Sequence, residues 1–129
     1  MNRSMDLPGM QLAPNGASKE ALDALVGLPT DLRAFLEQHD GGRGKVGTRP
    51  LILWSADQIA REAQSQEVSL STPGLLLFGT DGGAEGYGYL SRLRERRYGR
   101  IPLIAAGAHE FESMGSTLSE LLQALREGR

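Results

Sequence analysis

The sequence contains no cysteine, few aromatic residues and no long apolar run. Without cysteine the chain has no thiolate nucleophile, no cysteine-ligated zinc site and no disulfide framework, so the usual mark of a small secreted domain is missing. No segment approaches the ~20 consecutive apolar residues that a transmembrane helix needs. A formal net charge of -2 gives no overall case for nucleic-acid binding. We therefore expect a cytoplasmic protein without membrane contact or direct nucleic-acid contact.

The residues that are present fit one domain of ordinary size. The chain has 129 residues, of which 40% are hydrophobic and 23% charged, as is typical of a globular protein. At this length a single core buries roughly two-thirds of the unfolded surface. The first residues have no regular apolar pattern, so we expect a flexible leader over residues 1–17 and one domain over residues 18–129.

Two short helices are predicted at the start of the domain. The first follows a serine that suits the N-cap position and ends at a glycine. The second begins near a proline, whose fixed φ suits the first helical position, and ends at a glycine pair. Apolar residues recur at helical spacing in both. The first helix has Ser18, Leu22, Leu25, Val26 and Gly27 in these roles, and the second has Pro29, Leu32, Phe35, Leu36, Gly41 and Gly42.

The rest of the chain favours the α+β class. Strands are predicted at 51–55, 75–79, 85–91 and 101–107, the last with Pro102 at its start or at a sheet edge. A glycine-rich loop is expected before the first strand, and capping boxes begin helices after Ser55 and Thr117. Strands joined by a tight turn pair antiparallel. The prediction is one compact domain with a mainly antiparallel sheet, an N-terminal helix pair, and a C-terminal helix packed through Leu118, Leu121, Leu122 and Leu125.

Two glycine-rich stretches invite a nucleotide-binding interpretation that their spacing does not support. A phosphate-binding loop needs glycine five residues before its Gly-Lys pair and serine or threonine after it. Gly44-Lys45 has His39 and Val46 in those places. Gly86-Tyr87-Gly88 resembles the start of a dinucleotide fingerprint, but no helical pattern follows it. Neither stretch therefore predicts a cofactor.

The stretch "TDGG", residues 80–83, predicts a hairpin turn, because glycine adopts positive φ and Asp-Gly favours turns that match strand twist. Asp81 and Glu85 also form a carboxylate pair of the kind used for acid–base chemistry or metal binding. The turn favours a structural Asp81 that accepts hydrogen bonds from backbone amides. The role of Glu85 stays open.

No other motif predicts catalysis. His39 and His109 lack the spacing of a zinc motif, and no Gly-x-Ser-x-Gly sequence supports a hydrolase triad. We predict no catalytic, cofactor-binding or metal-binding residue.

Charge is segregated along the chain. Residues 92–100 contain five arginines and one glutamate, and the remainder carries more carboxylates than basic side chains. Such a segment fits contact with phosphate or with an acidic partner. A solvated loop between strands is the simpler interpretation.

Four motifs in order resemble the SUKH superfamily, which includes fungal cell-wall assembly regulators and bacterial toxin-immunity proteins. The stretches are "LVGLPTDLRAFLEQHDGG", "LILWSADQI", "GLLLFGTDGGAEGYGYL" and "STLSELLQAL". The likeness spans Ser18 to Leu125, with Asp40 where asparagine is commoner. The residues that carry the family pattern are Leu28, Pro29, Phe35, Gly41, Gly42, Trp54, Gly79, Asp81, Gly82, Gly83 and Glu85.

The resemblance implies a compact α+β fold, no catalysis and a protein partner. Bacterial relatives are often encoded beside toxins, frequently nucleases, and are thought to neutralise them by direct binding. If the partner has a basic face, carboxylates outside the arginine segment are the candidate contacts, first Glu62, Glu67 and Glu85. A general regulatory or scaffold module is the alternative, and an enzyme or phosphate-binding protein is a third.

Overall fold

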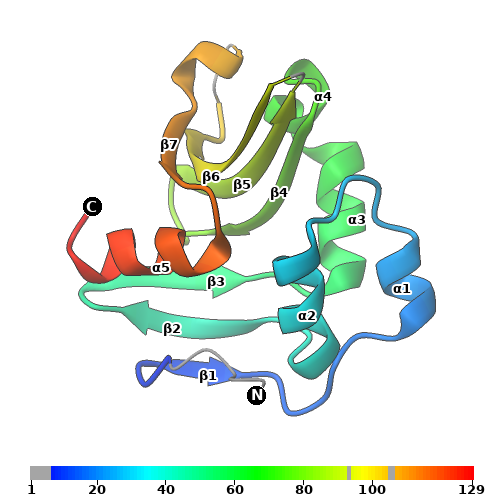
Figure 1. The fold of residues 1–129 in the computed structure, drawn as a ribbon, viewed down its shortest axis with the longest axis vertical. Coiled ribbons are helices and arrows are strands. Elements are labelled where there is room, and N and C mark those ends of the chain that lie inside the picture. The colour runs from blue at the N-terminus through cyan, green and yellow to red at the C-terminus, as the bar shows by residue number, and fades with distance from the viewer. Residues whose placement is uncertain (1–6, 93, 105–106) are drawn as a thin grey trace.

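Successive strands of the chain pair as neighbours and build one antiparallel sheet. The computed structural model describes residues 7–92, 94–104 and 107–129. Within them the sheet has seven strands in sequence order (Figure 1). The strands are β1 (Met10–Leu12), β2 (Gly42–Val46), β3 (Arg49–Leu53), β4 (Leu75–Thr80), β5 (Glu85–Arg92), β6 (Glu95–Pro102) and β7 (Glu112–Gly115).

The last three helices contact strands of the sheet, and the first helix contacts the second and third helices. The helices are α1 (Lys19–Asp23), α2 (Thr30–Gln38), α3 (Ala56–Ser65), α4 (Glu67–Ser71) and α5 (Leu118–Arg126), with a 3-10 turn η1 (Ala108–Glu110) before β7. In Figure 1, β1 to β3 run across the lower part and β4 to β7 rise from them, with α5 in the angle between the two parts. The predicted α+β class, with a C-terminal helix packed on an antiparallel sheet, is confirmed.

The sheet bends where β3 meets β4. Only two residue pairs join these strands, Ile52 with Thr80 and Leu53 with Gly79. A β-carbon on Gly79 would lie 2.5 Å from the carbonyl oxygen of Ile52, so glycine permits this close approach. This bend positions the turn after β4 beside α3.

Side-chain caps begin three helices as predicted. The hydroxyl oxygens of Ser18, Ser55 and Thr117 each accept a hydrogen bond from the amide three residues on, at 3.1, 3.2 and 3.1 Å. Each cap satisfies one amide that the helix itself leaves unpaired.

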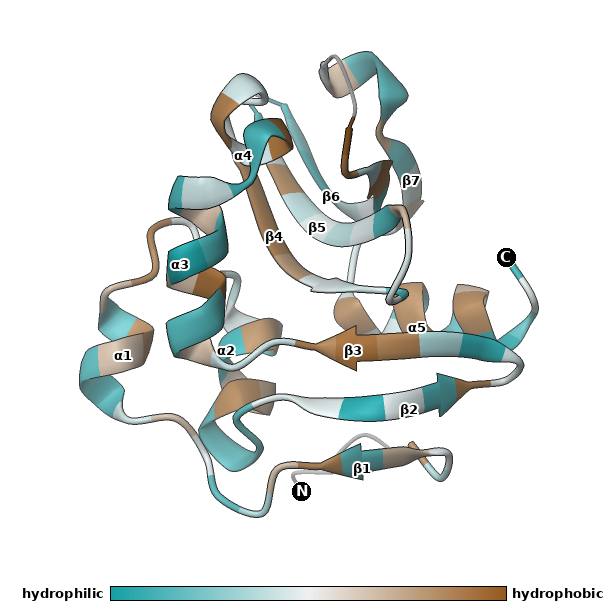
Figure 2. Ribbon diagram, turned by 180° about the vertical axis from the view of Figure 1, so that it is seen from behind, coloured by the Kyte–Doolittle hydropathy of each residue, from teal (hydrophilic) through white to brown (hydrophobic). Residues whose placement is uncertain are grey.

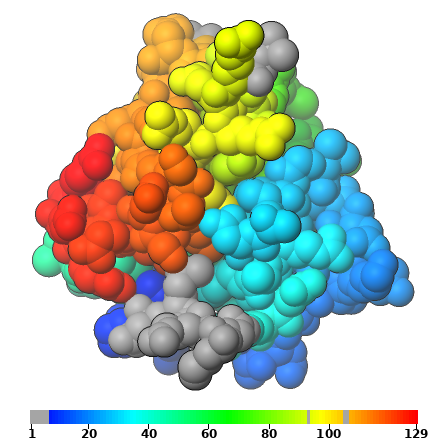
Figure 3. All heavy atoms as spheres, in the orientation of Figure 1, coloured from blue at the N-terminus to red at the C-terminus, as the bar shows by residue number. Residues whose placement is uncertain are grey.

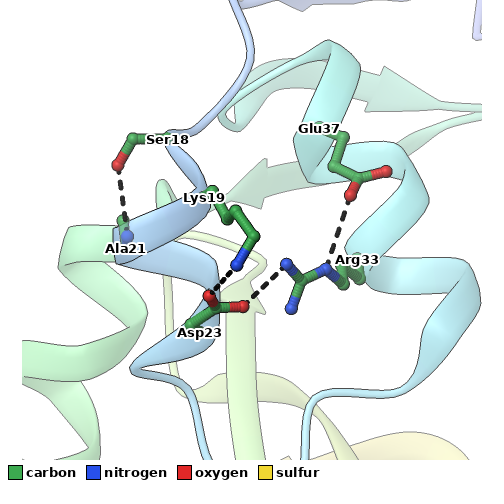
Figure 4. Close-up of polar contacts among 6 residues, drawn as sticks. All are labelled: Ser18, Lys19, Ala21, Asp23, Arg33 and Glu37. Atoms are coloured by element: carbon green, nitrogen blue, oxygen red, sulfur yellow. Dashed lines mark hydrogen bonds and ion pairs between the residues drawn. The ribbon is translucent and has the colours of Figure 1, made fainter.

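Ion pairs on the surface join α1 to α2 (Figure 4). Asp23 contacts Lys19 at 2.7 Å and Arg33 at 2.8 Å, and Arg33 contacts Glu37 at 3.4 Å. Hydrogen bonds from Lys19 and then Arg33 lower the pKa of Asp23. Because Lys19, Asp23 and Glu37 are exposed and Arg33 is half-buried, the pairs orient the helices and contribute little free energy.

The core contains most of the apolar residues that the sequence assigns to it. The four α5 leucines are buried, as are Leu22, Leu25, Leu32, Phe35 and Leu36. Figure 2 shows brown, apolar residues along β3 and β4. The prediction for Val26 is wrong, since it is 91% exposed. Helix α1 ends at Asp23, so Val26 lies in the turn before Gly27, whose φ is +80°.

Several connections that the sequence predicts as loops are strands. The glycine-rich segment before residue 51 forms β2 and the start of β3. The arginine segment is not a loop: it forms the end of β5 and most of β6, held by eight residue pairs between the two strands. The strand predicted at 101–107 therefore ends at Pro102, and residues 105 and 106 lie outside the described residues.

Residues 7–17, within the segment expected to be a leader, contain β1 and a buried Leu7. Strand β1 pairs with β2 through Met10 and Gly44. The boundary between residues 17 and 18 stays a prediction.

Candidate functional site

The turn between β4 and β5 is held by its own side chains. The Thr80 hydroxyl donates to the carbonyl oxygen of Glu85 at 2.8 Å and accepts from the Gly82 amide at 3.1 Å. Asp81 Oδ1 accepts from the amides of Gly83 at 2.7 Å and Glu85 at 3.2 Å. Gly82 has a φ of +85°. One carboxylate oxygen of Asp81 is thus already engaged by the turn.

The Asp-Gly-Gly motif after α2 fixes the start of α3. Asp40 Oδ1 accepts a hydrogen bond from the Ala56 amide at 2.8 Å, in the first turn of α3. Gly41 has a φ of +98°, and a β-carbon there would lie 2.7 Å from the carbonyl oxygen of Leu53. His39 ends α2 and places Nδ1 2.8 Å from the Ala13 carbonyl oxygen. These contacts give the Asp-Gly-Gly motif a structural role.

A groove of about 450 Å³ brings family-pattern residues next to a candidate partner contact. It lies between α3 and the β4–β5 turn, with the nearly buried Trp54 among its walls. Glu62, on its α3 side, accepts a hydrogen bond from Gln66 Nε2 at 2.8 Å. The lining residues are Arg43, Ile52, Trp54, Gln58, Glu62, Gln66, Thr80, Gly82, Gly83 and Leu103.

Glu85 lines a different hollow, of about 340 Å³, which has charges of both signs. Arg100 Nε donates to Glu112 Oε1 at 3.0 Å, and Arg49 Nη2 donates to the Gly128 carbonyl oxygen at 3.1 Å. Both arginines therefore have partners within the chain. The lining residues are Arg49, Glu85, Arg100, Pro102, Glu110 and Glu112.

The three predicted partner contacts do not share one site. Glu62 faces the groove, Glu85 faces the hollow, and Glu67 is exposed in the first turn of α4. Glu67 is the exposed one of the three, and the other two are half-buried.

Asp31 joins three elements, and the sequence analysis did not identify it. Tyr98 donates its hydroxyl hydrogen to Asp31 Oδ1. The Leu118 amide at the start of α5 donates to Oδ2 at 2.8 Å, and the Leu32 amide donates to Oδ1 at 2.9 Å. Burial, and then the bond to Asp31, raises the pKa of Tyr98 above its ordinary range. The partners lie 67 and 87 residues from Asp31, so no local pattern shows the contact.

The histidines remain apart from any metal-binding arrangement in the described part of the chain. His109 is exposed, 4.0 Å from a carboxylate oxygen of Glu110. Among residues 7–92, 94–104 and 107–129, no three histidine, aspartate or glutamate side chains gather as a metal site would require. In the same residues no helix combines the length and apolar character needed to cross a membrane.

The fold and these contacts define an α+β domain in which one Asp-Gly-Gly motif holds the start of α3 and the other holds the β4–β5 turn. The chain belongs to the SMI1 / KNR4 family (SUKH-1), whose family model matches residues 17–124. The resemblance found in the sequence is thereby confirmed over nearly the whole domain. No curated protein matches the chain closely enough to add a named relative. Membership supports an immunity or regulatory role in general, exercised through protein–protein interaction.

Proposed function

We propose that the protein is a bacterial immunity protein that neutralises a cognate toxin, such as a nuclease, by direct binding in the cytoplasm. The observation that carries the proposal is the family match over residues 17–124. We further propose that the chain performs no chemistry itself. In support, Asp40 and Asp81 each accept hydrogen bonds from backbone amides of the domain.

The candidate contacts for a basic partner surface are Glu62, Glu67 and Glu85. Opposite charges across an interface speed encounter and fix orientation. Glu67 is the strongest of the three because it is exposed, whereas Glu62 is bonded to Gln66 and Glu85 lies near Arg100.

Titration calorimetry with an inactivated form of the adjacent gene's product tests the proposal. We expect a saturable complex of fixed stoichiometry, and inhibition of the active toxin by the same chain. The Glu67→Lys variant should slow association with a basic partner, while Glu20→Lys, an exposed charge on α1, serves as the matched control. Absence of both binding and inhibition would overturn the immunity function.

The family also includes regulatory proteins, so a regulatory binding module is the second candidate. A protein partner that is not a toxin, bound with the same stoichiometry, would favour it. An enzyme or a phosphate-binding protein is a third, and a thermal-shift screen with metals and nucleotides tests it.

A further inference from the structure

The end of the β5–β6 hairpin carries four arginines close together. Arg92 ends β5, Arg94 lies in the connection, and Arg96 and Arg97 follow in β6. All four are exposed, and we call them the hairpin arginine surface. Figure 3 shows side chains of the yellow segment, which holds β6, standing out over the upper part of the face in view.

These arginines have little to bind within the described part of the chain. Among the described residues, none forms an ion pair with, or accepts a hydrogen bond from, the side chain of Arg92, Arg94 or Arg96, while the Arg97 side chain reaches the Ser116 hydroxyl at 3.5 Å. The carboxylate at this end of the hairpin, Glu95, lies opposite Arg92 in the strand pairing. In contrast, Arg100 further along β6 is paired with Glu112. Within the part of the chain that the structure describes, an excess of positive charge without an ion-pair partner therefore remains at this end of the sheet.

An exposed apolar residue lies at the same end of the molecule. Leu70 on α4 is 66% exposed. Residue 74, just after α4, accepts a hydrogen bond from the Ser91 amide at 2.9 Å through its carbonyl oxygen, so the chain leaving α4 runs beside the hairpin. Figures 1 and 2 show α4 next to the hairpin end from both sides. Arginine is enriched in protein interfaces relative to the rest of the surface, and Leu70 adds an exposed apolar side chain beside it.

We propose that the hairpin arginine surface and Leu70 form a docking surface for an acidic region of a protein partner, an inference that rests on the proposed function. Guanidinium groups bind carboxylates through two parallel hydrogen bonds, which single lysines do not. The docking surface is distinct from the carboxylates Glu62 and Glu85. A partner engaged here and at Glu67 would be oriented by charges of both signs.

The chemistry favours protein over nucleic acid as the occupant. The chain as a whole has a net charge of -2, so a long phosphate polymer would be repelled outside the hairpin. The hairpin also offers no fully exposed aromatic side chain for base stacking, because Tyr98 is buried and Tyr89 half-buried.

Paired charge reversals test the docking surface against a matched control. The test variant is Arg94→Glu with Arg96→Glu, and the control is Lys45→Glu on β2 with Arg61→Glu on α3, two exposed residues that line neither the groove nor the hollow. Both variants change the net charge equally. Melting temperatures should stay near that of the parent chain, because neither the Arg94 nor the Arg96 side chain has an ion-pair or hydrogen-bond partner among the described residues.

Binding of the inactivated product of the adjacent gene is then measured at low and high salt. We expect the hairpin variant to weaken affinity by about tenfold or more and to reduce its salt dependence, since exposed charge pairs are screened by salt. The control should change affinity far less. Leu70→Ser should weaken binding at both salt concentrations because apolar contact is not screened. Equal effects of the two charge variants, or no effect of either, would overturn the docking surface and leave the proposed function intact.

A second probe separates this inference from the proposed function. If the parent chain does not bind the adjacent gene's product, the proposed function fails, and an NMR titration with a decaglutamate peptide decides the inference. Amide shifts confined to residues 94–97 and α4, lost in the hairpin variant, would support it, and their absence would overturn it. Tighter binding of a short DNA duplex at the same residues would show that the docking surface binds nucleic acid and not an acidic protein.

Discussion

Three aspartates of this chain accept hydrogen bonds from backbone amides that would otherwise lack partners. Asp31 holds the start of α5, Asp40 the start of α3, and Asp81 the β4–β5 turn. Such charge-assisted bonds are stronger than those between neutral groups. At the scale of single residues, these three carboxylates therefore stabilise connections between elements, and one of them, Asp81, belongs to the carboxylate pair considered for chemistry in the sequence.

Gly82 is the residue of the β4–β5 turn that needs glycine. Its φ of +85° lies in the left-handed region, and the nearest atom to an added β-carbon is 3.7 Å away. Gly82→Ala should therefore lower the free energy of unfolding by roughly 1 kcal/mol or more through backbone strain alone. Gly83→Ala is the control, because Gly83 has no positive φ. Chemical denaturation measures both, and an equal loss at the two positions would contradict the account.

Tyr98 should make the fold sensitive to alkaline pH. Burial and the bond to Asp31 hold its pKa above the ordinary value of 10.0, so the unfolded chain loses this proton first as the pH rises. The stabilising contribution is complete below about pH 10 and decreases above it, by at most about 1.4 kcal/mol per pH unit for one group. Burial raises the pKa of Tyr87 as well, so part of the slope belongs to that residue.

Tyr98→Phe should reduce stability at neutral pH, because Asp31 loses a donor, and should flatten the alkaline decrease. Urea unfolding across the alkaline range measures the slope. Identical slopes for parent and variant would show that Tyr98 does not carry the effect.

At the scale of elements, α5 contributes five buried side chains to the core. Leu122 is 3% exposed and packs within the angle of the sheet. Leu122→Ala should cost about 2–5 kcal/mol and lower the melting temperature by many degrees. Ser119→Ala, on the exposed side of the same helix, should leave it nearly unchanged. A melting curve unaffected by the leucine substitution would remove α5 from the core.

Elements with local signals were predictable, and those stabilised by distant partners were not. Helices α3 and α5 follow from capping boxes and apolar spacing that lie within a few residues. Strand β2 has no such local signal, because its glycines allow the chain at residue 9 to approach closely. A β-carbon on Gly44 would lie 2.2 Å from the carbonyl oxygen of Gly9. Likewise, the charged arginines of β6 do not predict a strand, and the segment forms one because it pairs with β5.

The same distinction between local and distant signals applies to the candidate site. The turn role of Asp81 and the family pattern were visible in the sequence, since each lies within one short stretch. The groove at Trp54 was not, because residues from separate elements form it. The arginines of residues 92–100 were visible as a charged segment, but their place at the end of a hairpin beside α4 was not. Asp31 illustrates the limit most clearly, since its partners Tyr98 and Leu118 come from β6 and α5.

At the scale of the whole molecule, we predict a fold that does not depend on metal. The chain has no cysteine, and its described residues hold no cluster of metal-ligating side chains. Treatment of the purified protein with a chelator should leave its melting temperature unchanged. Stoichiometric zinc, calcium or magnesium retained through purification, with a melting temperature that falls on chelation, would contradict this.

The central claim is that the intact domain protects a cell by binding a toxin. Growth of cells that express the toxin encoded by the adjacent gene, with and without this chain, tests it most directly. The account predicts that co-expression restores growth, and that a chain destabilised by Leu122→Ala restores it less. Arrested growth while both proteins accumulate in folded form would contradict the claim.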